Sequence, residues 1–122
     1  MAIETNYRDI DIFKLSVNDP GTSNQVDLNC CVAHLKAGNS EEEAIERANE
    51  TSKLMNYLNN SGAAGNYTMS GDFNLYTASE QAFQNLLFHS NTSIRFYDPI
   101  NMIGSWNNND FFASVHTQST HT

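Results

Sequence analysis

The residues best suited to chemistry in this sequence lie where two predicted strands end. His34 closes one alternating segment, and Asp72 and Asn74 close another within Gly71-Asp72-Phe73-Asn74. A carboxylate beside a carboxamide suits a hard cation and a phosphate oxygen, and the amide adds no negative charge. Histidine titrates near neutral pH, so it can donate a proton or stabilise a developing negative charge. These residue types favour work on a phosphate ester.

Each of these residues also has an interpretation without chemistry. A Gly-Asp-x-Asn run after a strand forms ordinary turns, in which Asp and Asn bond to their own backbone. His34 alone fits a satisfied histidine at a strand end, and His116 and His121 fit exposed polar residues near the terminus. An unrelated α/β domain is therefore one alternative. A separation of more than about 10 Å between His34 and Asp72 would decide for this alternative, since one phosphate could not then touch both.

Strands and helices must position these residues. Segments 7–17 and 26–35 alternate in polarity and are joined by a loop of turn residues, which predicts an antiparallel pair. The alternation of 7–17 changes phase once, which indicates a bulge or a strand buried on both faces. The capping box Ser40-x-x-Glu43 opens a helix. The strand expected over 66–73 then lies parallel to 26–35.

The second half of the chain predicts further elements. A second capping box, Thr77-x-x-Glu80, opens a second helix. Residues 94–97 form a short strand or loop edge, and 111–118 alternate as a last strand. Strands that alternate with helices give an α/β fold, with a mixed β-sheet and two helices packed on it.

Composition limits the classes of function. The chain has 122 residues, which fits one domain, and its net charge of -8 argues against a purely electrostatic nucleic-acid binder. Bound divalent ions would supply positive charge locally. No apolar run approaches the ~20 residues of a membrane span, and the charges among the first residues lead us to expect no signal peptide in this stretch. Cys30 and Cys31 are adjacent and form neither a disulfide framework nor a zinc site, so two small buried hydrophobes are expected.

The order of these motifs resembles the endonuclease/exonuclease/phosphatase family, the deoxyribonuclease I-like proteins. A strand that ends in His34-Leu35, a helix and a strand that ends in Gly-Asp-Phe-Asn follow one another as in that family. The runs 34–38, 96–101 and 117–120 look like those of its secreted bacterial members. The resemblance covers nearly the whole chain.

The resemblance implies part of a four-layered α/β sandwich and hydrolysis of phosphate esters that depends on Mg²⁺ or Mn²⁺. His34 matches the histidine that assists the leaving group or stabilises the phosphate. Asp72 matches the aspartate that orients or activates water and touches the metal, and Asn74 the asparagine that holds the scissile phosphate. Ser119 and Thr120 match positions where hydroxyls approach the phosphate.

The sequence departs from the family pattern. The family's early Asn-Glu pair, its Asp-Arg pair and its closing Ser-Asp-His triplet have no match here. We therefore interpret residues 1–122 as one partial domain, the middle of a metal-dependent phosphoesterase with weak or no activity alone. Phe73 in the motif favours nuclease-like phosphodiester hydrolysis. The substrate could be a nucleic acid, a phospholipid head group or a sugar phosphate.

A middle fragment of a two-sheet fold would expose sheet edges and an apolar face. Such surfaces pair with other chains, so we expect a homodimer or a higher oligomer. The Asn/Ser/Thr-rich composition resembles exported bacterial proteins, which suggests a secreted or periplasmic parent. The second alternative is a non-catalytic domain that keeps the scaffold and binds a partner or a glycan.

Overall fold

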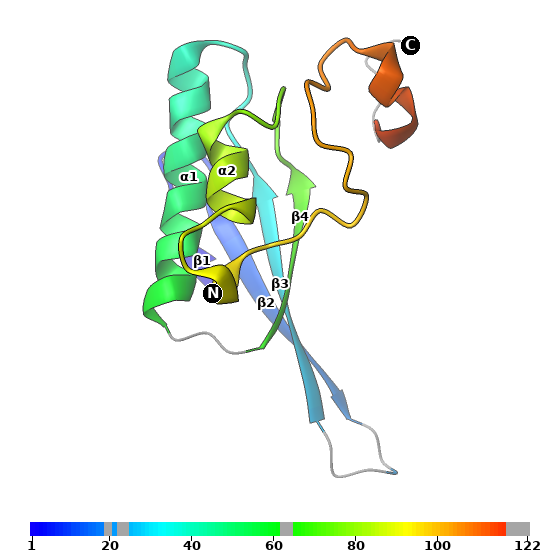
Figure 1. Ribbon diagram of the computed structural model, residues 1–122. Helices are drawn as coiled ribbons and strands as arrows, with labels where there is room; N and C mark the ends of the chain where they lie inside the picture. The colour runs from blue at the N-terminus through cyan, green and yellow to red at the C-terminus, as the bar shows by residue number, and fades with distance from the viewer. Residues whose placement is uncertain (19–20, 22–24, 62–64, 117–122) are drawn as a thin grey trace.

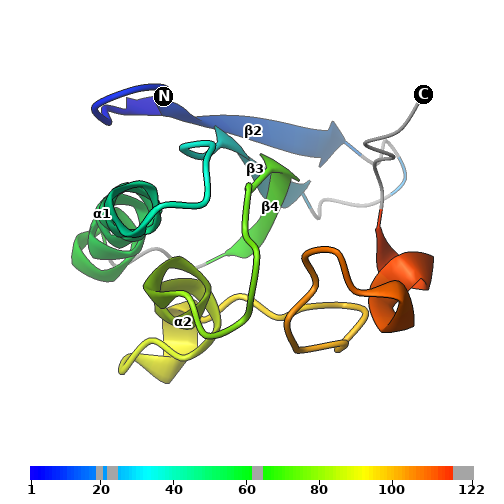
Figure 2. The same cartoon turned by 90° about the horizontal axis from the view of Figure 1, so that it is seen from above.

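One mixed sheet organises the chain, and two helices pack on one of its sides (Figures 1 and 2). The structure is a computed structural model that describes residues 1–18, 21, 25–61 and 65–116. Within them the sheet order is β1-β2-β3-β4. This arrangement confirms the predicted α/β class with a mixed sheet. The elements are β1 (Ala2–Ile3), β2 (Ile10–Asn18), β3 (Gln25–His34), α1 (Glu41–Asn60), β4 (Asn66–Asp72), α2 (Gln81–Leu87) and the 3-10 helices η1 (Thr92–Ile94) and η2 (Asp110–Val115).

Strand β3 is the centre of this sheet. It pairs antiparallel with β2, from Asp11 opposite Val32 to Asn18 opposite Gln25, and parallel with β4. The β2–β3 register runs without a bulge and one face of β2 is exposed, so neither alternative for 7–17, a bulge or a strand buried on both faces, is found. The change of phase instead marks two faces of one regular strand. The first apolar residues of β2 face the helices, and the later ones face away from them.

The predicted capping box starts α1. The Ser40 hydroxyl accepts from the Glu43 N–H at 3.3 Å, and the Glu43 carboxylate accepts from the Ser40 N–H at 2.9 Å. That backbone donor also lowers the pKa of Glu43. Glutamates in the first turn lie at the positive end of the helix dipole, which favours the helix at its observed start.

The core fills the space between the sheet and the helices. Cys31 belongs to it, and burial raises the pKa of its thiol to about 11, while Cys30 lies half-buried on the opposite face. The expected pair of buried cysteines is therefore correct for Cys31 only. Both thiols are free. The buried core residues are Ile10, Ile12, Cys31, Ala33, Leu35, Leu54, Met55, Leu58 and Leu86.

The second capping box is a wrong prediction. Helix α2 begins at Gln81, and Glu80, its N-cap residue, makes no side-chain cap bond. The Glu80 carboxylate instead accepts from the Tyr76 N–H at 2.9 Å and pairs with the Arg47 guanidinium. A charged partner from α1 satisfies Glu80 better than a neutral backbone donor at the helix start would.

The last predicted strand is also wrong. Residues 110–115 form the 3-10 helix η2, and positions 117 and 118 lie outside the described residues. The Asn109 side chain accepts from the Phe111 N–H at 3.1 Å and closes a turn. Within η2 only Phe112 is buried, and its ring packs against Gly104. The alternating residues therefore belong to a short helix and not to a strand. For residues 94–97 the loop alternative is correct and the short strand is not, because Ile94 ends η1 and 95–97 are irregular chain.

One side of the sheet carries no helix within the described part of the chain. Apolar side chains of β2 and β3 lie there side by side, because the strand register puts them on one face. We call this surface the open sheet face. Five of its residues are 42–64% exposed, and its members are Phe13, Leu15, Val17, Val26, Leu28, Cys30 and Val32.

Within the described residues, no helix is long and apolar enough to cross a membrane.

Candidate functional site

Three of the predicted site residues meet at the carboxyl ends of β3 and β4. The parallel register pairs His34 with Asp72, and His34 Nε2 lies 3.9 Å from Asp72 Oδ2. Both side chains are half exposed, at 49% each. Asn74 follows directly, and its side chain also reaches back to β3. We call His34, Asp72 and Asn74 the polar rim. His34 and Asp72 lie well within the separation of about 10 Å beyond which the unrelated-domain alternative would be preferred.

Gly71 allows the two strand ends to approach each other. Its φ of +135° is one that L side chains rarely adopt, and a Cβ added there would collide with the Ala33 carbonyl oxygen. Glycine therefore has two separate reasons to stand before Asp72. The close backbone contact also places the Leu35 N–H 3.0 Å from the Asp72 carbonyl, which extends the ladder past His34.

The residues after Gly71 form a tight turn. Asp72 Oδ1 accepts from the Asn74 N–H at 3.1 Å, and Asn74 itself takes a left-handed conformation with φ of 48°. This is the ordinary turn, with a side chain bonded to its own backbone, that we expect if the motif has no catalytic role. It coexists with the His34 contact, because Asp72 uses Oδ1 for the turn and presents Oδ2 to the imidazole.

Asn74 has donors left for a ligand. Its side-chain Nδ2 donates to the Leu35 carbonyl at 3.0 Å, which occupies one of the two amide hydrogens. The second hydrogen and the amide oxygen have no partner among the described residues. Asn74 can therefore donate to a phosphate oxygen while it is held in place by β3.

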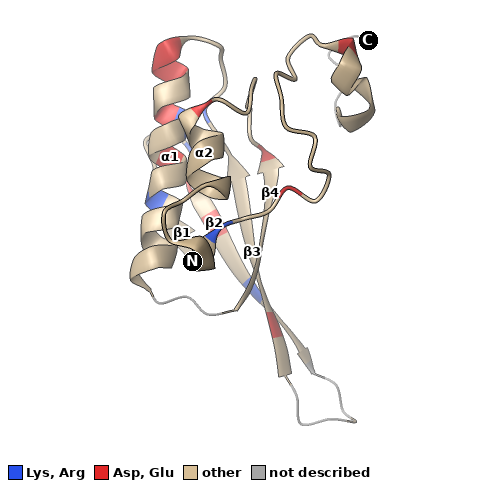
Figure 3. Cartoon of the chain, viewed as in Figure 1, with Lys and Arg blue, Asp and Glu red and all other residues tan. Residues whose placement is uncertain are grey.

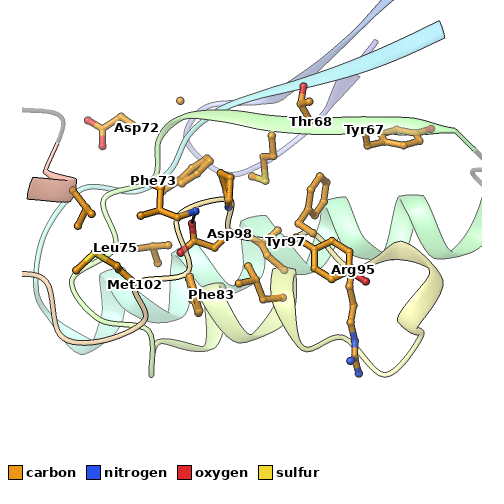
Figure 4. A pocket seen from close by; sticks show the side chains of 18 of the residues that line it. Tyr67, Thr68, Asp72, Phe73, Leu75, Phe83, Arg95, Tyr97, Asp98 and Met102 are labelled. Carbon is orange, nitrogen blue, oxygen red and sulfur yellow. Dashed lines mark hydrogen bonds between the residues drawn. The ribbon is translucent and has the colours of Figure 1, made fainter. Parts of the chain in front are cut away.

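A cleft of about 1420 Å³ borders the rim. Asp72 and Asn74 line it, together with β4, α2 and the chain from 93 to 102. In Figure 4, Asp72 lies at the edge of the cleft with its carboxylate turned away from the apolar side chains, such as Phe73 and Phe83, that line it. Trp106 packs edge-on against Phe83, with ring centroids 5.3 Å apart, so the cleft has a rigid aromatic wall.

The donor set fits a divalent ion only in part. The rim offers one carboxylate and one amide oxygen, and no group of three or more His, Cys, Asp or Glu in the described residues could hold a metal. Mg²⁺ commonly keeps several waters and binds through one or two carboxylates plus substrate phosphates. Asp72 would hold an ion that water and a substrate phosphate complete. The described residues do not form a complete site.

The remaining predicted residues lie apart from these contacts. Ser119, Thr120 and His121 fall outside the described residues, so the structure does not place them. His116 is exposed, lines the cleft, and has Nε2 3.0 Å from the Trp106 carbonyl. The described residues show no contact between His116 and the His34 imidazole.

Sequence reasoning missed a group of buried charges behind the rim. Arg47 and Glu50 are each 1% exposed, on the core-facing side of α1, and Glu80 pairs with Arg47 at 2.8 Å. The available signal was helical spacing, because Arg47, Glu50 and Leu54 fall on one stripe of the helix. A charged residue on such a stripe indicates a buried partner.

Acidic residues outnumber basic residues in the chain as a whole. The whole chain has 14 acidic and 6 basic residues, and Figure 3 shows acidic positions at the start of α1 and at the end of β4. Among the buried charges, desolvation raises the pKa of Glu50.

No known protein family, curated protein or solved structure matches this chain.

Proposed function

We propose that this chain supplies the phosphate-handling part of a metal-dependent phosphoesterase. The observation that carries the proposal is the 3.9 Å approach of the His34 imidazole to the Asp72 carboxylate at two neighbouring strand ends. Asn74 is held beside them by β3. An imidazole, a carboxylate and an amide donor within reach of one point suit a tetrahedral phosphate better than a planar or apolar ligand.

Each rim residue has a distinct part in hydrolysis. Asp72 Oδ2 orients the attacking water and takes its proton as the water oxygen bonds to phosphorus, since Oδ1 is committed to the turn. The free Asn74 amide hydrogen binds a phosphoryl oxygen and fixes the ester for in-line attack. His34 gives a proton to the leaving oxygen or stabilises its charge. Asp72 would hold Mg²⁺ or Mn²⁺, which when bound would supply positive charge against the charge on the phosphate oxygens.

The cleft suggests how the organic part of the ester is held. Its wall of apolar and aromatic side chains adjoins Asp72 and Asn74. A nucleic acid can place its phosphodiester on the rim and a base against this wall, because bases stack on aromatic rings. Because the net charge is -8, we expect the rim, the cation and the aromatic wall, and not a basic groove, to bind the nucleic acid.

The open sheet face fits the proposed family architecture. In a four-layered sandwich a second sheet packs against this kind of surface. The described part of the chain contains no second sheet, so in solution a second copy of the chain would cover the face. We therefore include a homodimer or higher oligomer in the proposal.

Cleavage of a phosphodiester tests the proposal. Supercoiled plasmid and the small diester bis(p-nitrophenyl) phosphate are incubated with the chain and Mg²⁺ or Mn²⁺, with and without EDTA. We expect weak cleavage that EDTA abolishes. Asp72→Asn should reduce it by roughly 100-fold, because it removes the charge but keeps an oxygen for the turn. Asp110→Asn, an exposed carboxylate of η2, is the matched control and should retain activity.

A second candidate is a binding domain without catalysis. The single carboxylate of the rim and the turn that occupies half of it favour this reading. It predicts no cleavage at high protein concentration, with plasmid or oligonucleotide binding that Asp72→Asn leaves unchanged. EDTA-sensitive cleavage that is lost in Asp72→Asn would exclude it.

A further inference from the structure

We propose that Arg47, Glu50 and Glu80 are positioning residues that set the relative places of the strand ends carrying the polar rim. We call these three residues the buried clamp. The inference rests on the proposed function, because it assigns them to that site. Their contacts join α1 to the two loops that follow the rim residues.

Arg47 holds the loop after β3. Its Nη1 donates to the Lys36 carbonyl at 2.9 Å and to the Gly38 carbonyl at 2.7 Å. The guanidinium is 1% exposed, so water does not compete for these bonds. Lys36 lies two residues after His34, and this loop therefore leaves the strand in a direction that Arg47 defines.

Glu80 holds the loop after β4. Its Oε2 accepts from Arg47 Nε at 2.8 Å, and its Oε1 accepts from the Tyr76 N–H at 2.9 Å. The Arg47 guanidinium also lies over the Tyr76 ring, 5.4 Å from its centroid. Tyr76 lies two residues after Asn74. The same arginine thus reaches both loops, one directly and the other through Glu80.

Glu50 adds a second bond to the first loop. Its Oε2 accepts from the Lys36 N–H at 2.9 Å, while Oε1 has no hydrogen-bond partner among the described residues. Lys36 is therefore held through its N–H by Glu50 and through its carbonyl by Arg47. Both bonds come from successive turns of α1, a rigid support.

The chemistry of the clamp favours a positioning role over a general gain in stability. Buried charges lose hydration, and well-packed apolar side chains of similar size often stabilise a fold as well or better. An apolar side chain cannot orient a backbone carbonyl or N–H. The planar guanidinium of Arg47 presents donors in a fixed fork and makes three directed bonds at once.

Hydrogen exchange of the intact chain, followed by NMR, tests the inference without requiring activity. Two amides report the rim directly: the Leu35 N–H, which donates to the Asp72 carbonyl, and the Asn74 N–H, which donates to Asp72 Oδ1. The test variant combines Arg47→Met with Glu80→Met, which removes both charges and keeps apolar volume. We expect protection at the two reporter amides to fall roughly tenfold or more, with the β2–β3 ladder little changed.

Two further variants keep the test decisive. Glu80→Gln keeps the shape and an acceptor for Tyr76, so it should fold even if the double variant does not, and it should show a smaller loss at the same amides. Arg95→Met is the matched control, because Arg95 ties a loop remote from the rim through the His89 carbonyl. It should leave the reporter amides unchanged. An equal loss of protection across the β2–β3 ladder and the reporters would overturn the positioning role, as would no loss in either clamp variant.

Cleavage activity provides a second, independent test of the buried clamp. If the plasmid assay detects cleavage, Glu80→Gln should lower kcat with KM little changed, because the reacting groups are displaced while the cleft remains. If the wild type shows no cleavage but the reporter amides lose protection, the proposed function fails and the positioning of the strand ends stands. If Glu80→Gln has a normal kcat although its reporter amides lose protection, the buried clamp does not contribute to catalysis.

Discussion

The side-chain amide of Asn74 donates to the backbone carbonyl of Leu35 at 3.0 Å. This bond joins the turn after β4 to the residue after β3, and it runs beside the backbone bond from the Leu35 N–H to the Asp72 carbonyl. The two bonds lock two strand ends that α1 separates in sequence. These two bonds hold the strand ends together at the rim, and the buried clamp holds the loops that leave them.

Gly71 should tolerate no side chain. Gly71→Ala puts a Cβ against the Ala33 carbonyl at a positive φ, so we expect the free energy of unfolding to fall by about 2–4 kcal/mol. Gly65→Ala is the control, because its φ is also positive but its nearest neighbour, Asn29 Nδ2, lies at an ordinary 3.4 Å. Urea denaturation compares the two. An equal loss in both variants would mean that backbone strain alone, and not the Ala33 contact, requires the glycine.

The two Ser/Thr–Glu motifs should respond differently to alanine. Ser40→Ala removes a working N-cap and should cost about 1 kcal/mol of unfolding free energy. Thr77→Ala should cost less than about 0.5 kcal/mol, because α2 begins later and takes no cap from Thr77. Thermal denaturation followed by circular dichroism measures both. A cost at Thr77 as large as that at Ser40 would contradict the observed start of α2.

Glu50 should make stability depend on pH. Burial raises its pKa above 4.5 in the folded chain, so the native state holds a proton that the unfolded state releases. Its contribution is fully present below pH 4.5 and is lost as pH rises through the raised pKa. Glu50→Gln cannot titrate, so the stability of the wild type relative to this variant should decline across that window. Urea midpoints at matched pH values measure it, and a constant difference would contradict the prediction.

The open sheet face should drive self-association. We expect light scattering to report a mass above the 13.6 kDa of one chain. Phe13→Lys with Leu15→Lys places charge among the exposed apolar side chains and should shift the chain to monomer. Ile45→Lys, at an exposed apolar position of α1, is the control and should leave the mass unchanged. A wild-type monomer at high concentration would refute self-association through this face.

Local sequence signals predicted the elements that position the rim. The Ser40–Glu43 box starts a helix because both bonds close within four residues. The meeting of His34 with Asp72 was also predictable, since parallel neighbouring strands present their carboxyl ends at one edge. Short-range bonding and strand direction suffice for both.

Tertiary structure alone decided the rest. The sequence predicts that Glu80 caps a helix, but Arg47 from α1 pairs with it instead. The sequence also predicts a strand over 111–118, but 111–115, which the structure describes as part of η2, pair with no strand. The alternation of β2 and β3 shows which side chains share a face, but not that one face is left without a helix in the described chain. The physical reason is common to all three. Each outcome depends on a partner distant in sequence, and a pattern of residue types records only what neighbouring residues can satisfy.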